Sequence, residues 1–402
     1  MPQSPASPPS TPENPTRAIS RRGWRSRQRW AICGAAVLLL VLAAIAAAGW
    51  HFSSAVLVPE HKPWYDPVEV EDVAPGRITF DRSDATLRPG YYGLVWHSGH
   101  ALVGPIVRQD ADTVTRELRG VEGYLEPGTE QIGFDSSTFS GTPAEARGLP
   151  FSEVMVEGEL GPMPAWLVPG RAHSEPETWA IVVHGINDDP QVGLRILPTL
   201  RRAGLGSLSI TYRDDLGAPP SPDGLHHQGL TEWRDLEAAT RYALAHGAHR
   251  LVLVGYSMGG ALIGQFMQRS PLASHVSALV LDAPALDWNA ILEFNAERMG
   301  YPAFAALPVK WAIDLRINPD WNSLDVLRHT EDFHLPTLLF HGDDDEVVPI
   351  ETSEEFAAEL PRWVEYHAVP EAGHTQSWNV NPPLYERRLK RFLGETTGAQ
   401  AD

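Results

Sequence analysis

The stretch Gly255-Tyr256-Ser257-Met258-Gly259 is the most informative part of this chain. It follows directly on the apolar run 251–254, which predicts a serine on a sharp turn between a strand and a helix. A serine hydroxyl is a poor nucleophile unless a nearby base takes its proton. Glycines on both sides permit a cramped backbone, and the start of a helix supplies backbone amides beside the serine. The stretch therefore predicts that Ser257 is a catalytic nucleophile.

A histidine suited to be the base follows the last expected strand. Gly373-His374 lies in a loop between the apolar run 364–369 and a final helix expected from about residue 383. Imidazole has an unperturbed pKa of about 6.5, so it can take the serine proton and return it to a leaving group. His374 is the predicted base. Four other histidines are available, but none of them lies in a glycine-flanked loop after the last strand: His226, His227, His334 and His367.

A carboxylate is needed to fix the imidazole tautomer and to stabilise its protonated form. Four acids at 343–346 follow the apolar run 337–340 and are candidates for this role. Chemistry alone does not choose among them, because a run of acids in a loop is often only solvated surface. Asp282, directly after the apolar run 276–281, competes with all four.

A turn at 184–187 ends the apolar run 179–183 and predicts an oxyanion site. Backbone amides at such a turn can stabilise the negative charge that develops on a carbonyl oxygen under attack. We predict that the amides of Ile186 and Met258 form the pair, with Gly185 permitting close approach. His184 is expected to brace the turn and not to act as the base.

From residue 151 onward, apolar runs alternate with amphipathic segments, which predicts an α/β domain with a mostly parallel sheet and helices on both faces. The alternation breaks over 284–334, where apolar helices predict a small lid. This α/β domain is expected to cover 151–394, with a disordered tail over 395–402. The expected strands are 154–157, 163–168, 179–183, 208–212, 251–254, 276–281, 337–340 and 364–369.

The N-terminal region predicts export from the cytoplasm. Residues 1–30 are rich in Pro, Ser and Arg and are expected to be a disordered basic tail, while 31–49 lack charge and are long enough to cross a bilayer. Arginines before the span keep the N-terminus in the cytoplasm and place the catalytic domain outside. A cleaved secretory signal is the alternative, since small residues end the apolar run. Export with a single cysteine, Cys33, favours a bacterial envelope.

Two further segments separate the span from the α/β domain. Residues 50–76 hold prolines and aromatics without a period, which predicts a linker. Short alternating runs split by glycines predict a small β-rich module over 77–150. Its role is expected to be support or orientation of the main domain, with substrate recognition as the alternative.

Composition excludes several classes of partner. The net charge is −19, although the first thirty residues hold six Arg and one Glu, so the remainder is strongly acidic and unsuited to nucleic acid. The histidines are scattered and no glycine-rich cofactor loop is evident. No metal and no cofactor are expected.

The motifs at 255–259, 184–185, 341–349 and 373–374 together resemble the α/β-hydrolase superfamily, with the order Ser, Asp, His. The resemblance covers about 151–393, and within the superfamily the chain is similar to the serine aminopeptidase and monoacylglycerol-lipase-like branch and to membrane-anchored relatives. It implies the α/β-hydrolase fold.

The resemblance also implies roles for individual residues. In the family, the acid is the fifth residue of a His-Gly-x-x-Asp-x-x-Val-Pro stretch, which carries the role onto Asp345 and leaves Asp343 a structural loop residue. The segment 212–215, Tyr-Arg-Asp-Asp, departs from the glycine-rich turn of the relatives. The family's substrate preferences are therefore not carried over.

The activity implied is a serine hydrolase that cleaves a carboxylic ester, less readily an amide, through an acyl-enzyme. Apolar side chains over 288–311 favour a small-molecule or lipid-like ester as substrate. Two alternatives stay open: an acyltransferase that uses the same triad, and a membrane-anchored binding or scaffold protein without catalysis. The sequence does not indicate the natural substrate or the oligomeric state.

Overall fold

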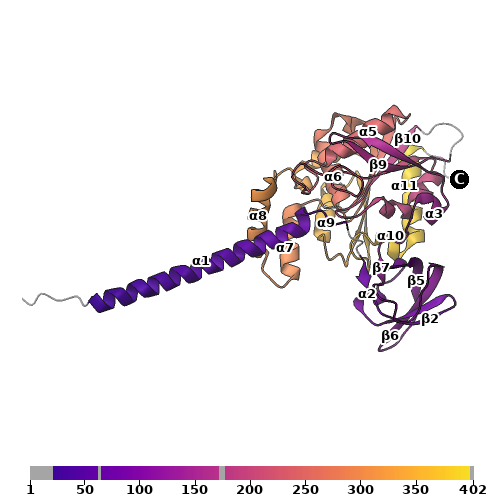
Figure 1. The fold of residues 1–402 in the computed structure, drawn as a ribbon. Helices are drawn as coiled ribbons and strands as arrows, with labels where there is room; N and C mark the ends of the chain where they lie inside the picture. Colours follow the sequence, from indigo (N-terminus) through magenta and orange to yellow (C-terminus); the bar gives the residue numbers. More distant parts are fainter. Residues whose placement is uncertain (1–20, 62–64, 172–176, 399–402) are drawn as a thin grey trace, which may run out of the picture. The chain divides into compact units, whose positions relative to one another are not determined.

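The computed structural model describes residues 21–61, 65–171 and 177–398 (Figure 1). The chain divides into two compact units, residues 1–48 and residues 49–402. Helix α1 (Arg21–Leu57) runs through the boundary, and its portion from Arg29 to Leu57 is long and apolar enough to span a membrane.

Helix α1 extends beyond the predicted span 31–49 at both ends. Residues 21–30, expected in the disordered tail, are helical, whereas 1–20 lie outside the described residues. Arginine is a good helix former, so the basic segment continues the helix. At the other end, Ser53 and Leu57 are fully buried, and this packing extends the helix into the predicted linker.

The β-rich module is a seven-stranded antiparallel sheet in the order β1-β7-β4-β5-β6-β3-β2. Two of its strands lie within 50–76, so the linker prediction is wrong there. A register shift in β2 and the two-residue length of β1 hide the alternation that would have revealed them. The strands are β1 (Asp66–Pro67), β2 (Val70–Ala74), β3 (Arg77–Asp81), β4 (Tyr92–Trp96), β5 (Gly99–Gln109), β6 (Thr113–Glu122) and β7 (Gly133–Asp135).

The second sheet confirms the predicted α/β architecture. Its order is β15-β14-β13-β12-β10-β11-β9-β8; the six strands from β15 to β11 are parallel, and β9 and β8 form an antiparallel hairpin at one edge. Its strands are β8 (Ser152–Glu157), β9 (Pro162–Val168), β10 (Thr178–Val183), β11 (Gly206–Ile210), β12 (Arg250–Tyr256), β13 (Val276–Asp282), β14 (Thr337–Gly342) and β15 (Val364–Val369).

Alternating side chains of the central strands build a core on each face of this sheet. In β10, Ile181 and Val183 join one cluster, whereas Ala180 and Val182 join the other. The first face is covered by α5 (Trp233–Ala245), α6 (Met258–Arg269) and α9 (Ile350–Glu359), and the second by a 3₁₀ helix η1 (Pro190–Arg195), α4 (Leu197–Arg202) and α11 (Pro382–Thr397). Helix α11 includes residues 395–397, which were expected in the disordered tail, and 399–402 lie outside the described residues.

The lid lies between β13 and β14, over the predicted interval 284–334. It consists of α7 (Trp288–Arg298), η3 (Ala303–Ala306), α8 (Leu307–Ile317) and η4 (Val326–Phe333). It shares a small buried cluster with the end of α1, formed by Leu57, Leu292, Ala306 and Ile313. The end of α1 is therefore part of the packed body.

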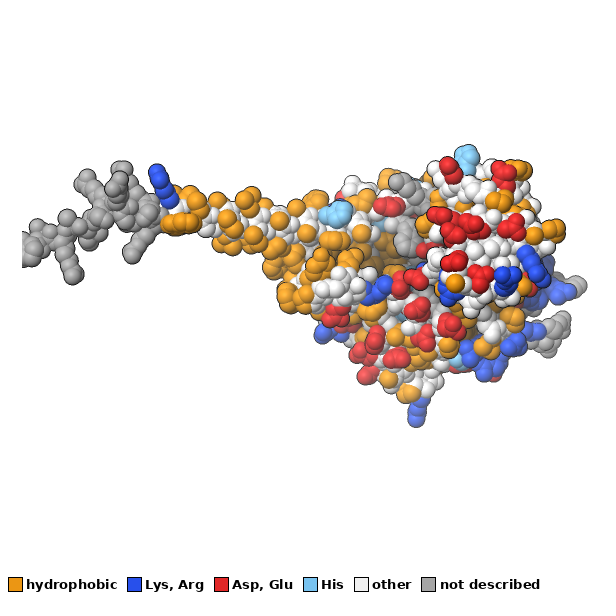
Figure 2. Space-filling view, turned by 90° about the horizontal axis from the view of Figure 1, so that it is seen from below, with side chains coloured by type: hydrophobic (Ala, Val, Ile, Leu, Met, Phe, Trp, Pro, Cys, Tyr) orange, Lys and Arg blue, Asp and Glu red, His pale blue; other side chains and the backbone are white. Residues whose placement is uncertain are grey.

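The acidic composition is distributed over the surface. On the face drawn in Figure 2, Asp and Glu side chains are spread across the body rather than gathered into one stripe. Such a distribution favours solubility.

Candidate active site

Ser257 occupies a strained turn between β12 and α6. Its φ of 50° and ψ of −119° lie in a region that residues other than glycine rarely adopt. A Cβ at Gly255 would lie 2.7 Å from Ile263, and a Cβ at Gly259 would collide with the carbonyl oxygen of Val183. Only glycine fits at either position, which explains locally why the chain turns so sharply at the serine.

Ser257, His374 and Asp345 form one continuous line of hydrogen bonds. The Ser257 Oγ lies 2.8 Å from His374 Nε2, and His374 Nδ1 lies 2.8 Å from Asp345 Oδ2. The three residues follow β12, β15 and β14, whose parallel carboxyl ends meet at one rim of the sheet. The serine and the aspartate are buried, whereas the His374 side chain is 20% exposed. The imidazole therefore faces both the Ser257 hydroxyl and the open cavity.

Asp345 is fixed on both oxygens. Its Oδ1 accepts hydrogen bonds from the backbone N–H of Val347 and Val348 at 2.8 and 2.9 Å. Burial by itself would raise the pKa of Asp345, but His374 and His341 hold that pKa well below its usual range. The carboxylate is therefore ionised throughout the neutral range, as required of a group that stabilises an imidazolium.

His341 is a contact of the acid that the sequence did not reveal. Its Nε2 lies 3.2 Å from Asp345 Oδ2 and 3.1 Å from the carbonyl oxygen of Val348, while its Nδ1 lies 2.7 Å from Ser353 Oγ. Two acceptors at Nε2 require the proton there, so Nδ1 accepts from the serine hydroxyl. This buried ring holds the loop of Asp345 against α9.

Two of the competing acids, Asp282 and Asp343, have partners elsewhere. Asp282 accepts a hydrogen bond of 2.7 Å from Ser377 Oγ, and burial raises its pKa. Asp343 accepts from the backbone N–H of Glu371 at 2.7 Å. Only Asp345, among the described acids, is hydrogen-bonded to His374.

The predicted oxyanion amides flank the serine. Gly185 lies against Ser257, because a Cβ at Gly185 would be 3.1 Å from the serine Cβ. Met258 is the first residue of α6, so its N–H has no partner within the helix. Within the described hydrogen bonds, neither this N–H nor that of Ile186 has an acceptor. Both donors therefore stay candidates for the oxyanion site.

His184 braces the turn. Its Nδ1 lies 2.8 Å from the carbonyl oxygen of Gly185 and its Nε2 lies 2.9 Å from Asp215 Oδ2, so both nitrogens face acceptors and both carry protons. Burial alone would lower the pKa of His184, but the charge of Asp215 outweighs burial and raises that pKa to about 9. The ring also stacks on Tyr212, whose hydroxyl donates to Gly185 at 2.6 Å. An imidazolium without an unprotonated nitrogen cannot act as the base.

The raised pKa of His184 predicts a pH dependence of stability. The imidazole titrates near 6.5 when unfolded, so its stabilising contribution is complete below about pH 6.5 and is lost as the pH rises through about 9. We expect the melting temperature of the wild type minus that of His184→Gln to be largest near pH 6 and to shrink toward pH 10. The control His100→Gln, at a partly exposed histidine, should show no such trend. A difference that grows with pH contradicts the imidazolium assignment.

Comparison with known proteins supports the predicted fold and class of enzyme. The model of the prolyl oligopeptidase family matches residues 222–400, which contain all three residues of the hydrogen-bonded line. A crystal structure of the esterase Pf2001 from Pyrococcus furiosus aligns with 64% of this chain and 95% of its own, at 19% identity and a TM-score of 0.52. The protein has the α/β-hydrolase fold, and the family match supports the serine hydrolase that the sequence predicted.

Other comparisons extend this placement. A second crystal form of the Pyrococcus esterase aligns at 21% identity and a TM-score of 0.50, with 64% and 97% of the two chains covered. The uncharacterized protein Rv2307c of Mycobacterium tuberculosis is 27% identical over 220 residues, which are 54% of this chain and 69% of that protein. YfhR of Salmonella typhimurium is 24% identical over 280 residues, 66% and 87% of the two chains. The β module matches a domain of unknown function, DUF8805, over residues 69–131.

A cavity of about 2270 Å³ opens over the serine of this hydrolase. Ser257 and His374 lie in its wall, together with residues 185–187 of the predicted oxyanion turn. The apolar part of the wall comes from three other parts of the body: Leu292 and Met299 of the lid, Phe52 and Val56 of α1, and Trp96 and Phe134 of the β module. The lid and the β module of the hydrolase both therefore shape the space next to Ser257.

The β module is hydrogen-bonded to the loop that carries His374. Asn379, in α10 (Ser377–Val380), donates a hydrogen bond of 2.9 Å to the carbonyl oxygen of Ser136 in the module. Its Oδ1 accepts one of 2.9 Å from the buried Arg195. Arg195 also donates to the carbonyl oxygen of Thr375, at 2.8 Å, directly beside His374. Partners so distant in sequence leave no local signal, so the sequence did not reveal this junction.

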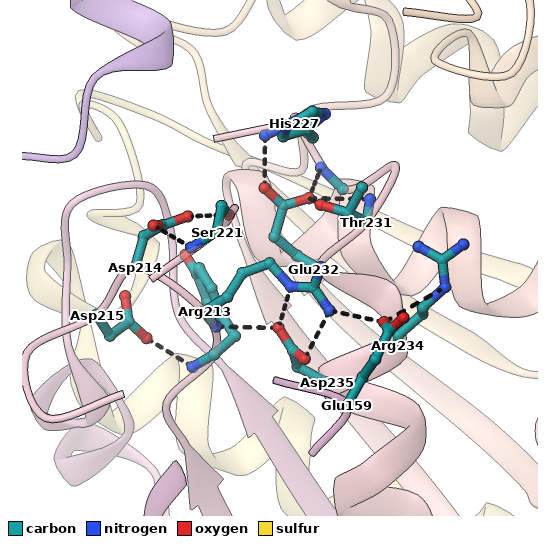
Figure 3. Close-up of polar contacts among 12 residues, drawn as sticks. Glu159, Arg213, Asp214, Asp215, Ser221, His227, Thr231, Glu232, Arg234 and Asp235 are labelled. Atoms are coloured by element: carbon teal, nitrogen blue, oxygen red, sulfur yellow. Dashed lines mark hydrogen bonds and ion pairs between the residues drawn. The ribbon is translucent and has the colours of Figure 1, made fainter. Parts of the chain in front are cut away.

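The segment 212–215, which departs from the family's glycine-rich turn, is held by ion pairs (Figure 3). Arg213 donates from Nε and Nη2 to the two oxygens of Asp235 at 2.7 and 2.9 Å, and both side chains are almost fully buried. Asp214 accepts from the backbone N–H of Ser221 at 2.7 Å. Asp214 and Asp215 of this segment thus have partners of their own, and both line the cavity.

The described side chains offer no metal centre. No group of three or more His, Cys, Asp or Glu residues in the described ranges is arranged to hold an ion. The chemistry proposed for the hydrolase uses only its own side chains and backbone amides.

Proposed function

We propose that this hydrolase cleaves carboxylic esters with an apolar acyl chain through Ser257, His374 and Asp345. The observation that carries the proposal is the unbroken line of hydrogen bonds from the serine to the aspartate at the wall of a partly apolar cavity. Each of the three residues has the chemistry that its position in a serine hydrolase requires.

In the first half of the proposed reaction, Ser257 Oγ attacks the ester carbonyl carbon while His374 Nε2 takes the hydroxyl proton. The amides of Ile186 and Met258 hold the negative oxygen of the tetrahedral intermediate. Collapse of that intermediate breaks the bond to the alcohol, which leaves with the proton from His374. Asp345 stabilises the imidazolium while it carries that proton.

In the second half, water replaces the alcohol. His374 takes a proton from the water as its oxygen attacks the acyl carbon, and the same two amides hold the oxyanion again. Return of the proton to Ser257 Oγ releases the carboxylic acid and restores the enzyme. An alcohol in place of water would give acyl transfer, which product analysis with a competing alcohol separates from hydrolysis.

One side of the cavity wall is apolar and suits an acyl chain. The other side is acidic and disfavours an alcohol leaving group that carries negative charge. Lid and α1 side chains supply the apolar side. Asp135, Asp188 and Asp189 also line the cavity, and burial raises the pKa of Asp135 and of Asp188 to about 6. At neutral pH these carboxylates repel a negatively charged alcohol group.

Esters of p-nitrophenol with acyl chains of increasing length test the proposal. Each buried methylene contributes about 0.8 kcal/mol, so kcat/KM is expected to rise by about tenfold or more from acetate to octanoate. The rates are measured by release of p-nitrophenol. Acetate as the best substrate contradicts an apolar acyl site. An aminoacyl p-nitroanilide cleaved faster than every ester would instead favour the amide chemistry that the prolyl oligopeptidase match raises.

We place the hydrolase in a bacterial envelope, with α1 as a retained anchor, the N-terminus in the cytoplasm and the catalytic body outside. The apolar helix and the arginines before it support this placement. Protein that stays in the membrane fraction after a high-salt wash supports the anchor, and a soluble chain that begins near residue 49 supports cleavage of a secretory signal instead.

A further inference from the structure

An exposed apolar stripe follows η3 and α8 of the lid. Its residues are spaced by three, four and four positions, which puts them on one side of a helix. Phe304 is 71% exposed, Trp311 is 61% exposed and Leu315 is 83% exposed. The stripe consists of Phe304, Leu307, Trp311 and Leu315. The opposite side of α8 already packs on the body, since Ile313 there is buried. Contiguous exposed apolar surface of this kind marks an interaction site.

The stripe lies beside the end of α1. The guanidinium of Arg316, the residue after the last of the stripe, lies 4.8 Å from the centre of the Trp50 ring and donates 2.9 Å hydrogen bonds to Ser53 and Ser54. Gly49 packs on the backbone of Pro308 at the start of α8. Trp50 is itself more than half exposed. Figure 2 shows hydrophobic side chains gathered around this end of α1.

Two tryptophans bracket the uncharged segment of α1. Trp30 and Trp50 are both exposed and twenty residues apart, which is about 30 Å along a helix, the thickness of a hydrocarbon core. Tryptophan is enriched where the hydrocarbon meets the headgroups. Trp50 therefore marks the outer interface, and α8, which carries most of the stripe, contacts it through Arg316.

The same elements form a wall of the substrate cavity. Met299, Tyr301 and Val309 of the lid line the cavity, as do Phe52 and Val56 of α1. The other side of this lid region carries the stripe. An acyl chain that leaves the bilayer at this interface would therefore meet the cavity wall directly.

We propose that the stripe Phe304, Leu307, Trp311 and Leu315 inserts into the outer leaflet of the bilayer that α1 spans, and that the enzyme takes its ester from that leaflet between the lid and α1. The substrate class is then a membrane-resident ester with long acyl chains. The inference rests on the proposed ester hydrolysis.

The test uses full-length protein in vesicles of dioleoyl phosphatidylcholine that carry a long-chain umbelliferyl ester. In the double variant Trp311→Ser/Leu315→Ser, loss of the interfacial apolar area should lower the rate on the embedded ester by about tenfold or more. The rate on soluble p-nitrophenyl butyrate should stay unchanged, because neither residue lines the cavity. Both side chains are exposed, so their removal empties no core, and a melting curve checks the fold.

Tyr124→Ser is the matched control, because Tyr124 is 71% exposed on the β module and lies outside the stripe. It should leave both rates unchanged. Equal rates of wild type and double variant on the embedded ester overturn the inference, whereas failure of the wild type on soluble butyrate overturns the proposed function. The inference is also overturned if the wild type forms a dimer in detergent, the double variant does not, and the rate on the embedded ester is unchanged. That result would show that a second copy of the chain covers the stripe.

Discussion

Replacing Ser257 with alanine is expected to lower kcat by roughly 10⁴- to 10⁶-fold on the best ester of the panel. The substitution removes only Oγ, which is the atom that His374 Nε2 faces at 2.8 Å. The oxyanion amides and the cavity stay in place, so a small residual rate above that of water is expected. Labelling by a fluorophosphonate probe should vanish, because the probe needs the same nucleophile.

The fold of the Ser257→Ala variant should survive. Alanine meets the same backbone strain at φ 50° that serine already tolerates, so the melting temperature is expected to change by only a few degrees. Ser274→Ala is the matched control, since Ser274 is exposed and its hydroxyl donates only to the carbonyl oxygen of Pro271. Full activity or full labelling in the Ser257 variant, with the control behaving like wild type, would end the nucleophile assignment.

The parts of the site predicted from sequence are those with a local cause. Ser257 lies in a turn whose glycines are required by contacts within a few residues or with the adjacent strand. His374 follows a strand and a glycine, and parallel strands bring their carboxyl ends to one rim regardless of the distance along the chain. The α/β architecture was predictable for the same reason, because continuous apolar runs such as β10 need helices on both faces.

The parts that were not predicted depend on contacts between distant residues. Four adjacent acids have the same chemistry, and only the three-dimensional path of the loop turns Asp345 toward His374 while Asp343 binds the backbone of Glu371. The junction through Asn379 joins segments that are 243 residues apart. The end of α1 is helical because Leu57 finds a buried place against the lid, a partner that the linker sequence does not reveal.

Asp345→Asn is expected to lower kcat by about 10⁴-fold, whereas Asp282→Asn should change it by no more than a few-fold. An asparagine at position 345 offers an amide where His374 Nδ1–H needs an acceptor, so the imidazole loses the tautomer that accepts the serine proton. Asp282 is buried and paired with Ser377, and no hydrogen bond of the described residues joins it to His374. The two substitutions have the same chemistry, so each is the control for the other, measured with the same ester and probe.

The pH dependence of the melting temperature is a second test of Asp345→Asn and Asp282→Asn. The pKa of Asp345 is depressed in the folded state, so its contribution is present above the unfolded value of about 3.9 and is lost as the pH falls toward the folded value. The melting temperature of the wild type should exceed that of Asp345→Asn near pH 6, and the gap should narrow below about pH 4. Burial raises the pKa of Asp282, so ionisation of this carboxyl opposes folding. The melting temperature of Asp282→Asn relative to that of the wild type should therefore increase as the pH rises. If Asp282→Asn is instead the variant with crippled kcat, the acid lies one strand earlier, and Asp345 only anchors its own loop.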